Sequence, residues 1–63
     1  MLLLVRKCLT ASDAEPVLSW NGETFTFPAS DMARAARLAR TFAKHNADEQ
    51  YGVMRADGTI EWA

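Results

Sequence analysis

Apolar and polar residues alternate on both sides of Asn21-Gly22, within the stretch PVLSWNGETFTFP at 16–28. Asn-Gly readily adopts the two positive φ angles of a two-residue type I′ turn, so the stretch predicts a β-hairpin. Counting outward from that turn places Trp20 opposite Glu23, and opposed residues share a face of the sheet. The face predicted to contact the core carries Leu18, Trp20, Phe25 and Phe27, and the other face carries Val17, Ser19, Thr24 and Thr26.

A second stretch of the same kind, YGVMRADGTIEWA at 51–63, has Asp57-Gly58 between two short alternating runs. A two-residue turn there pairs Val53 with Trp62 and predicts another hairpin. Its inner face would carry Tyr51, Val53, Ile60 and Trp62, and its outer face Met54, Ala56, Thr59 and Glu61. These faces depend on the loop length, because a register shift of one residue moves every side chain to the other face.

Between the hairpins the periodicity predicts a helix, with Ser30 or Asp31 as its N-cap and Lys44 and His45 near its end. Its apolar positions form one continuous arc, made of Met32, Ala35, Ala36, Leu38, Ala39, Phe42 and Ala43. The opposite side carries four cations spaced three or four residues apart: Arg34, Arg37, Arg40 and Lys44. Like charges at this spacing repel one another on a helix, so a group outside the helix would be needed to compensate them.

The stretch LLLVRKCL at 2–9 predicts a first strand, which gives the order β-β-β-α-β-β. We therefore expect an α+β fold, with about five strands in one antiparallel or mixed sheet and the helix on one side. No linker or repeat divides residues 1–63, which predicts a single domain. The other face of the sheet would be open and rich in hydroxyl groups. The predicted core is Leu18, Trp20, Phe25, Leu38, Phe42, Val53, Ile60 and Trp62.

Composition excludes several classes of protein. The 63 residues are 49% hydrophobic and 24% charged, which is typical of a globular protein, and the net charge of −1 argues against a strongly cationic nucleic-acid binder. The single cysteine, Cys8, cannot form an intramolecular disulfide, which favours a reducing, cytoplasmic setting. The opening MLLLVRKCL lacks the features of a signal peptide, and its apolar run is too short to span a membrane.

Candidates for catalysis are few. Cys8 and His45 are each the only residue of their type, and we expect a buried strand cysteine and a helix-end histidine rather than a nucleophile pair. One cysteine and one histidine cannot form a structural zinc site, and no phosphate-binding loop or dinucleotide motif is present. The sequence therefore predicts no enzyme activity and no cofactor.

Recognition is the remaining class of function. The cations of the helix form either an ordinary solvated face or a contact face, for an acidic protein surface or for nucleic acid. The open sheet face, represented by Val17, Thr24 and Thr26, is the alternative contact surface. Trp20 and Trp62 could anchor an interface, but a domain this small is expected to need both in its core.

These observations predict a non-catalytic binding protein that occupies a surface of a larger protein or protein–nucleic acid complex. In size and in its lack of motifs the chain resembles small inhibitors of phages and mobile elements, including anti-CRISPR proteins. Two other classes remain open: a nucleic-acid-binding accessory domain that uses the helix, and a homo-oligomeric subunit joined through sheet edges. We expect a monomer or a weak homodimer.

Overall fold

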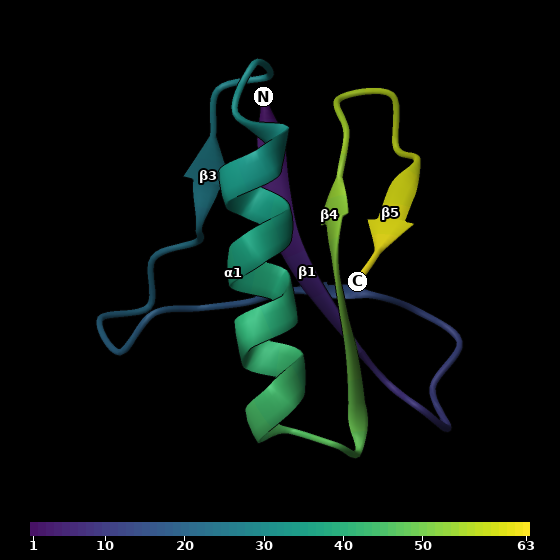
Figure 1. Cartoon of the computed structure of the whole chain (residues 1–63). Coiled ribbons are helices and arrows are strands. Elements are labelled where there is room, and N and C mark those ends of the chain that lie inside the picture. Colours follow the sequence, from purple (N-terminus) through teal and green to yellow (C-terminus); the bar gives the residue numbers. More distant parts are fainter.

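One helix packs on one face of a five-stranded antiparallel sheet in the computed structural model, which describes all 63 residues (Figure 1). The order β-β-β-α-β-β and the α+β fold are confirmed. The elements are β1 (Leu2–Cys8), β2 (Glu15–Pro16), β3 (Thr26–Phe27), α1 (Met32–His45), β4 (Glu49–Met54) and β5 (Ile60–Trp62). The sheet order is β2-β1-β4-β5, and β3 pairs with the other end of β1. At 14 residues, α1 is neither long nor apolar enough to span a bilayer.

The core lies between α1 and the sheet. Its buried residues are Leu2, Leu4, Val17, Ala35, Ala39, Tyr51 and Val53, and Phe25, Phe27, Met32, Leu38, Phe42 and Ala43 pack against them. Ala35 and Ala39, both on the predicted apolar arc of the helix, are completely buried. Phe42 stacks on Tyr51 with ring centroids 5.4 Å apart and meets Phe25 edge-on at 5.9 Å.

The first hairpin turn is one residue longer than predicted. The backbone N–H of Ser19 donates to the carbonyl of Glu23 at 2.7 Å, and the N–H of Gly22 donates to Ser19 at 2.9 Å. Only Gly22 has a positive φ, +86°, so the loop is a type I turn followed by a glycine bulge, not a type I′ turn. Leu18 consequently lies opposite Thr24, where the prediction placed Phe25.

The second turn has the same form. Arg55 donates its N–H to the carbonyl of Thr59 at 2.8 Å, and Gly58 has φ of +91°. Met54 therefore pairs with Ile60 and Gly52 with Trp62. Because paired residues share a face and Val53 faces the core, Ile60 and Trp62 lie on the face opposite α1. Their predicted place in the core is wrong.

The same shift in register corrects three assignments in the first hairpin. Val17, predicted on the open face, is buried in the core and only 6% exposed. Leu18 and Trp20, predicted in the core, are 59% and 98% exposed. Phe25 does pack against the core, as predicted, because the extra loop residue displaces only the first arm of the hairpin relative to the prediction.

The sheet face opposite α1 is apolar, not hydroxyl-rich. Thr24 and Thr26 are exposed on it, but the strand pairings also place Leu3, Val5, Met54, Ile60 and Trp62 there. Trp62 lies over Gly52, where an added Cβ would approach its Cε3 to 2.9 Å. Val5, which pairs with Gly52, is only 1% exposed. Side chains of the chain itself therefore cover part of this face.

Candidate functional site

The outer face of α1 carries Arg37, Arg40 and Lys44, all of them exposed. None of the three has an acidic side chain within 4.0 Å. The helical spacing brings them to one face as predicted, because residues three and four apart are neighbours on a helix. We call these three residues the cationic face.

Arg34, the fourth cation of the predicted set, differs from the other three. Its Nε lies 3.4 Å from the carboxylate of Asp31, which is the N-cap residue of α1. The Asp31 side chain makes no capping hydrogen bond and pairs with Arg34 one turn along the helix. The charge of Arg34 is thus compensated within the chain.

The remaining arginines are also paired. Arg6 contacts Glu49 at 3.3 Å and Glu15 at 4.0 Å, and Arg55 pairs with Glu61. Every arginine outside the cationic face therefore has an acidic partner. The Nζ of Lys7 donates to the carbonyl of Ala11 at 3.1 Å.

Acidic residues concentrate elsewhere on the molecule. Residues 9–33 contain no lysine or arginine and four acids: Asp13, Glu15, Glu23 and Asp31. Two loops in this range, one before β2 and one between β2 and β3, project from opposite sides of the sheet (Figure 1). The stretch before α1 is therefore acidic, and the outer face of α1 carries the cations that have no acidic partner.

Trp20 is a surface feature that the sequence reasoning assigned to the core. It stands at the tip of the first hairpin turn and is 98% exposed, and its neighbours in the turn are hydrogen-bonded to one another. Ser19 donates its hydroxyl to Asn21 Oδ1, and the same oxygen accepts the N–H of Glu23 at 3.2 Å. The residue that could have predicted the exposure of Trp20 is Gly22, because a glycine with positive φ also fits a three-residue loop.

A groove opens beside this turn, between the first arm of the hairpin and the last part of α1. It has a volume of about 320 Å³. It is lined by Arg6, Glu15, Pro16, Val17, Leu18, Phe42, Asn46 and Tyr51. Apolar and aromatic side chains meet a carboxylate and a guanidinium here, which gives the groove a mixed character.

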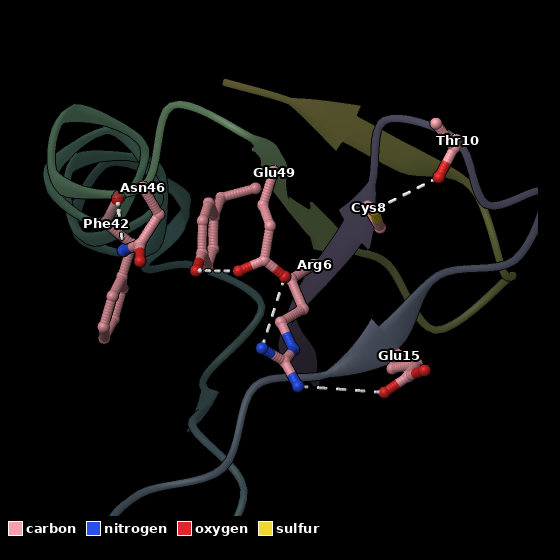
Figure 2. A network of polar contacts seen from close by, with 8 residues as sticks. Arg6, Cys8, Thr10, Glu15, Phe42, Asn46 and Glu49 are labelled. Atoms are coloured by element: carbon pink, nitrogen blue, oxygen red, sulfur yellow. Dashed lines mark hydrogen bonds and ion pairs between the residues drawn. The ribbon is translucent and has the colours of Figure 1, made fainter.

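A polar network holds this region together (Figure 2). Arg6 contacts Glu49 Oε2 at 3.3 Å, and the Tyr51 hydroxyl donates to Glu49 Oε1 at 3.1 Å. Burial, and then the contact with Glu49, raises the pKa of Tyr51 above its ordinary value. Asn46 donates to the carbonyl of Phe42 at 3.0 Å and closes the end of α1.

Cys8 is exposed at the end of β1, contrary to the predicted buried position. Its Sγ and Thr10 Oγ1 form a hydrogen bond of 3.4 Å, which lowers the pKa of the thiol. His45 is exposed at the C-terminal end of α1 and makes no hydrogen bond with Cys8. No three His, Cys, Asp or Glu side chains gather in an arrangement that could hold a metal ion.

Comparisons with models of protein families, with curated proteins and with solved structures found no match for this chain. The surface of the chain itself offers three candidate features for binding: the cationic face, the Trp20 turn and the groove beside that turn.

Proposed function

We propose that this chain is a non-catalytic binding protein that docks through Arg37, Arg40 and Lys44 on an acidic surface of a larger protein or protein–nucleic acid complex. The observation that supports the proposal is selective pairing. Each of the other arginines has an acidic partner within the chain, and these three neighbouring cations have none. An acidic partner would supply the compensation that the fold leaves out.

The energetics of the helix favour this interpretation over an incidental solvated face. Like charges three or four residues apart cost roughly 0.2–0.5 kcal/mol per pair on an isolated helix. The pairing of Arg34 with Asp31 shows that this helix can compensate a cation locally. Unpaired cations on a surface speed the encounter with an acidic partner and fix its orientation. The cations that repel one another on the helix are therefore useful in binding.

A protein surface suits the charge distribution better than nucleic acid. The net charge is −1, and the acids of residues 9–33 would repel a phosphate backbone that extended beyond the helix. Nucleic-acid binding through the same face is the second candidate, because the spacing of the three cations also suits phosphates. The two candidate functions predict different results with random-sequence DNA: a nucleic-acid binder should bind it, and a protein that docks on an acidic protein surface should not.

Occupying a partner's surface is how small inhibitors of the phage or mobile-element type act, anti-CRISPR proteins included, and the proposal extends to that role. We place the interaction in the cytoplasm, where the free thiol of Cys8 would stay reduced. The exposed Thr24 and Thr26, on the face opposite α1, form the alternative contact surface.

The experiment compares three immobilised proteins in capture from a cell lysate, with identification by mass spectrometry. The test variant carries Arg37→Gln, Arg40→Gln and Lys44→Gln, and the matched control carries Arg34→Gln and Arg55→Gln, which removes cations that are already paired. We expect one protein or complex to bind wild type and control at low salt and to be lost from the test variant. Equal capture by all three would contradict the proposal.

Two parallel arms separate the alternatives. Binding of a random-sequence DNA duplex that weakens steeply with salt, and is lost in the test variant, would transfer the function to nucleic acid. A variant with Thr24→Ala and Thr26→Ala tests the other surface. Loss of capture in this variant, with capture retained by the triple variant, would place recognition on the open face.

A further inference from the structure

The turn between β2 and β3 exposes large apolar side chains to water. A chain of this size is expected to bury such side chains. Trp20 is 98% exposed and Leu18 is 59% exposed, within two residues of each other. Tryptophan combines a large apolar surface with one N–H donor, and it is the residue most typical of the energetic centre of an interface. The turn therefore has the character of an anchor.

The loop that carries Trp20 is ordered by its own hydrogen bonds before any binding. The backbone hydrogen bonds of Ser19 with Glu23 and Gly22 close the loop, and Asn21 bridges to both the N–H and the carboxylate of Glu23. A rigid loop loses less conformational freedom on binding than a flexible one. Trp20 itself makes no polar side-chain contact that binding would have to break.

The groove beside the turn has the chemistry that receives an indole. The partly buried Phe42 supplies an aromatic ring backed by the buried Tyr51, and the exposed Arg6 supplies a guanidinium that can stack on an aromatic face. Glu15, whose side chain is 72% exposed, supplies the carboxylate oxygen that a buried indole N–H requires as acceptor. A volume of about 320 Å³ lies within the range of sites that hold small ligands.

The geometry points to a second copy of this chain as the occupant. We propose that two copies associate about a twofold axis, each inserting Trp20 into the groove beside the other's turn. Leu18 belongs both to the anchor arm and to the groove wall, so anchor and receptor form one continuous patch. A patch that contains both is self-complementary, and a twofold axis satisfies both contacts at once.

The expected interface is small. An aromatic side chain buries about 150–250 Å², so two Trp20 and two Leu18 side chains with their grooves approach the low end of the 1,200–2,000 Å² of stable interfaces. The dimer should therefore form in a concentration-dependent way. None of Arg37, Arg40 and Lys44 lines the groove, so the dimer would leave two cationic faces free. The inference is independent of the proposed function.

The test measures mass in solution by sedimentation equilibrium over a wide range of protein concentration. Wild type should rise from 7.0 kDa toward twice that mass, and Trp20→Ala should stay at 7.0 kDa. Leu9→Ala, which removes another exposed leucine, is the matched control and should behave as wild type. A wild type that stays monomeric throughout, or a Trp20→Ala variant that dimerises equally, would overturn the proposal.

Fluorescence gives a second readout that reports on Trp20 alone. Trp62→Phe leaves one tryptophan and keeps an aromatic ring over Gly52. In this background the emission of Trp20 should shift to shorter wavelength as dimer forms, and Glu15→Ala should weaken that shift. A shift that is already complete at the lowest concentration would mean insertion within one chain. A shift that appears only with phosphatidylcholine vesicles would mean a lipid surface, and either result would overturn the dimer.

Discussion

Phe42 links α1 to β4 through Tyr51 and to the residue before β3 through Phe25. Replacing it with alanine should lower the free energy of unfolding by roughly 3–5 kcal/mol, because the substitution removes buried surface and leaves a cavity. That loss is a large part of the stability available to a domain of this size. Urea denaturation measures it, with the exposed Thr41→Ala as control. A Phe42→Ala variant that unfolds cooperatively at the wild-type midpoint would show that this aromatic contact is unimportant.

Tyr51 gives a prediction about alkaline pH. Its pKa is raised in the folded chain by burial and by Glu49, so the unfolded chain loses the phenolic proton first as pH rises. The contribution to stability is present below pH of about 10 and is lost as pH rises through the higher pKa of the folded state. Tyr51 is the only tyrosine, so ultraviolet absorbance of tyrosinate follows it directly. Glu49→Gln should lower this pKa, and an unchanged titration would contradict the assigned role of Glu49.

Gly52 is the one glycine whose lack of a side chain serves packing. A Cβ at this position would lie 2.7 Å from the carbonyl oxygen of Glu61 and 3.0 Å from Ile60 Cγ2. Gly52→Ala should therefore displace β5 from β4 and destabilise the fold by roughly 1–3 kcal/mol. Amide hydrogen exchange should show faster exchange in β5 than in β1. Wild-type exchange in β5 would mean that the strand can shift at no cost.

At the scale of secondary structure, the sequence predicts which elements exist better than it predicts their register. Both hairpins are present, because Asn21-Gly22 and Asp57-Gly58 each mark a turn between alternating runs. The same dipeptides fit a two-residue turn with two positive φ angles and a three-residue loop with one, at glycine. Both turns take the second form. Because the dipeptide fits both loops, local turn chemistry alone could not predict the register.

The helix is the opposite case. Its apolar arc and its charged face follow directly from the 3.6-residue period, and the structure buries Ala35 and Ala39 as that period requires. The helical period could not show which of the charged side chains form ion pairs. Asp31 lies one turn before Arg34, so the ion pair was available to sequence reasoning, but only the structure shows that Arg37, Arg40 and Lys44 have no partner.

The stability of the helix should not depend on the cationic face. Replacing Arg37, Arg40 and Lys44 with glutamine removes repulsion between neighbours and breaks no ion pair, so the melting temperature should stay the same or rise slightly. Circular dichroism during heating measures it. Arg34→Gln, which breaks the pair with Asp31, is the comparison and should lower stability by less than about 1 kcal/mol. A marked loss of stability in the triple variant would mean that the cations serve the fold.

Taken as a whole, the molecule carries three cations without an acidic partner on the outer face of α1, and its other arginines are paired with acids. Half of the candidate site could be predicted from the sequence, because helical spacing alone places Arg37, Arg40 and Lys44 together. The exposure of Trp20 could not be predicted from the sequence, because it follows from the register of the hairpin. The reasoning that a small domain needs every tryptophan in its core was wrong for Trp20 and for Trp62, which packs on the opposite face of the sheet.

The most direct test of the docking proposal measures the association rate constant between this chain and the partner that it captures. Wild type and the triple glutamine variant are compared at low and at moderate salt. If the cationic face steers docking, the variant should associate about tenfold or more slowly at low salt, and its rate should respond less to added salt. Equal rates with equal salt dependence would show that Arg37, Arg40 and Lys44 are an ordinary solvated face.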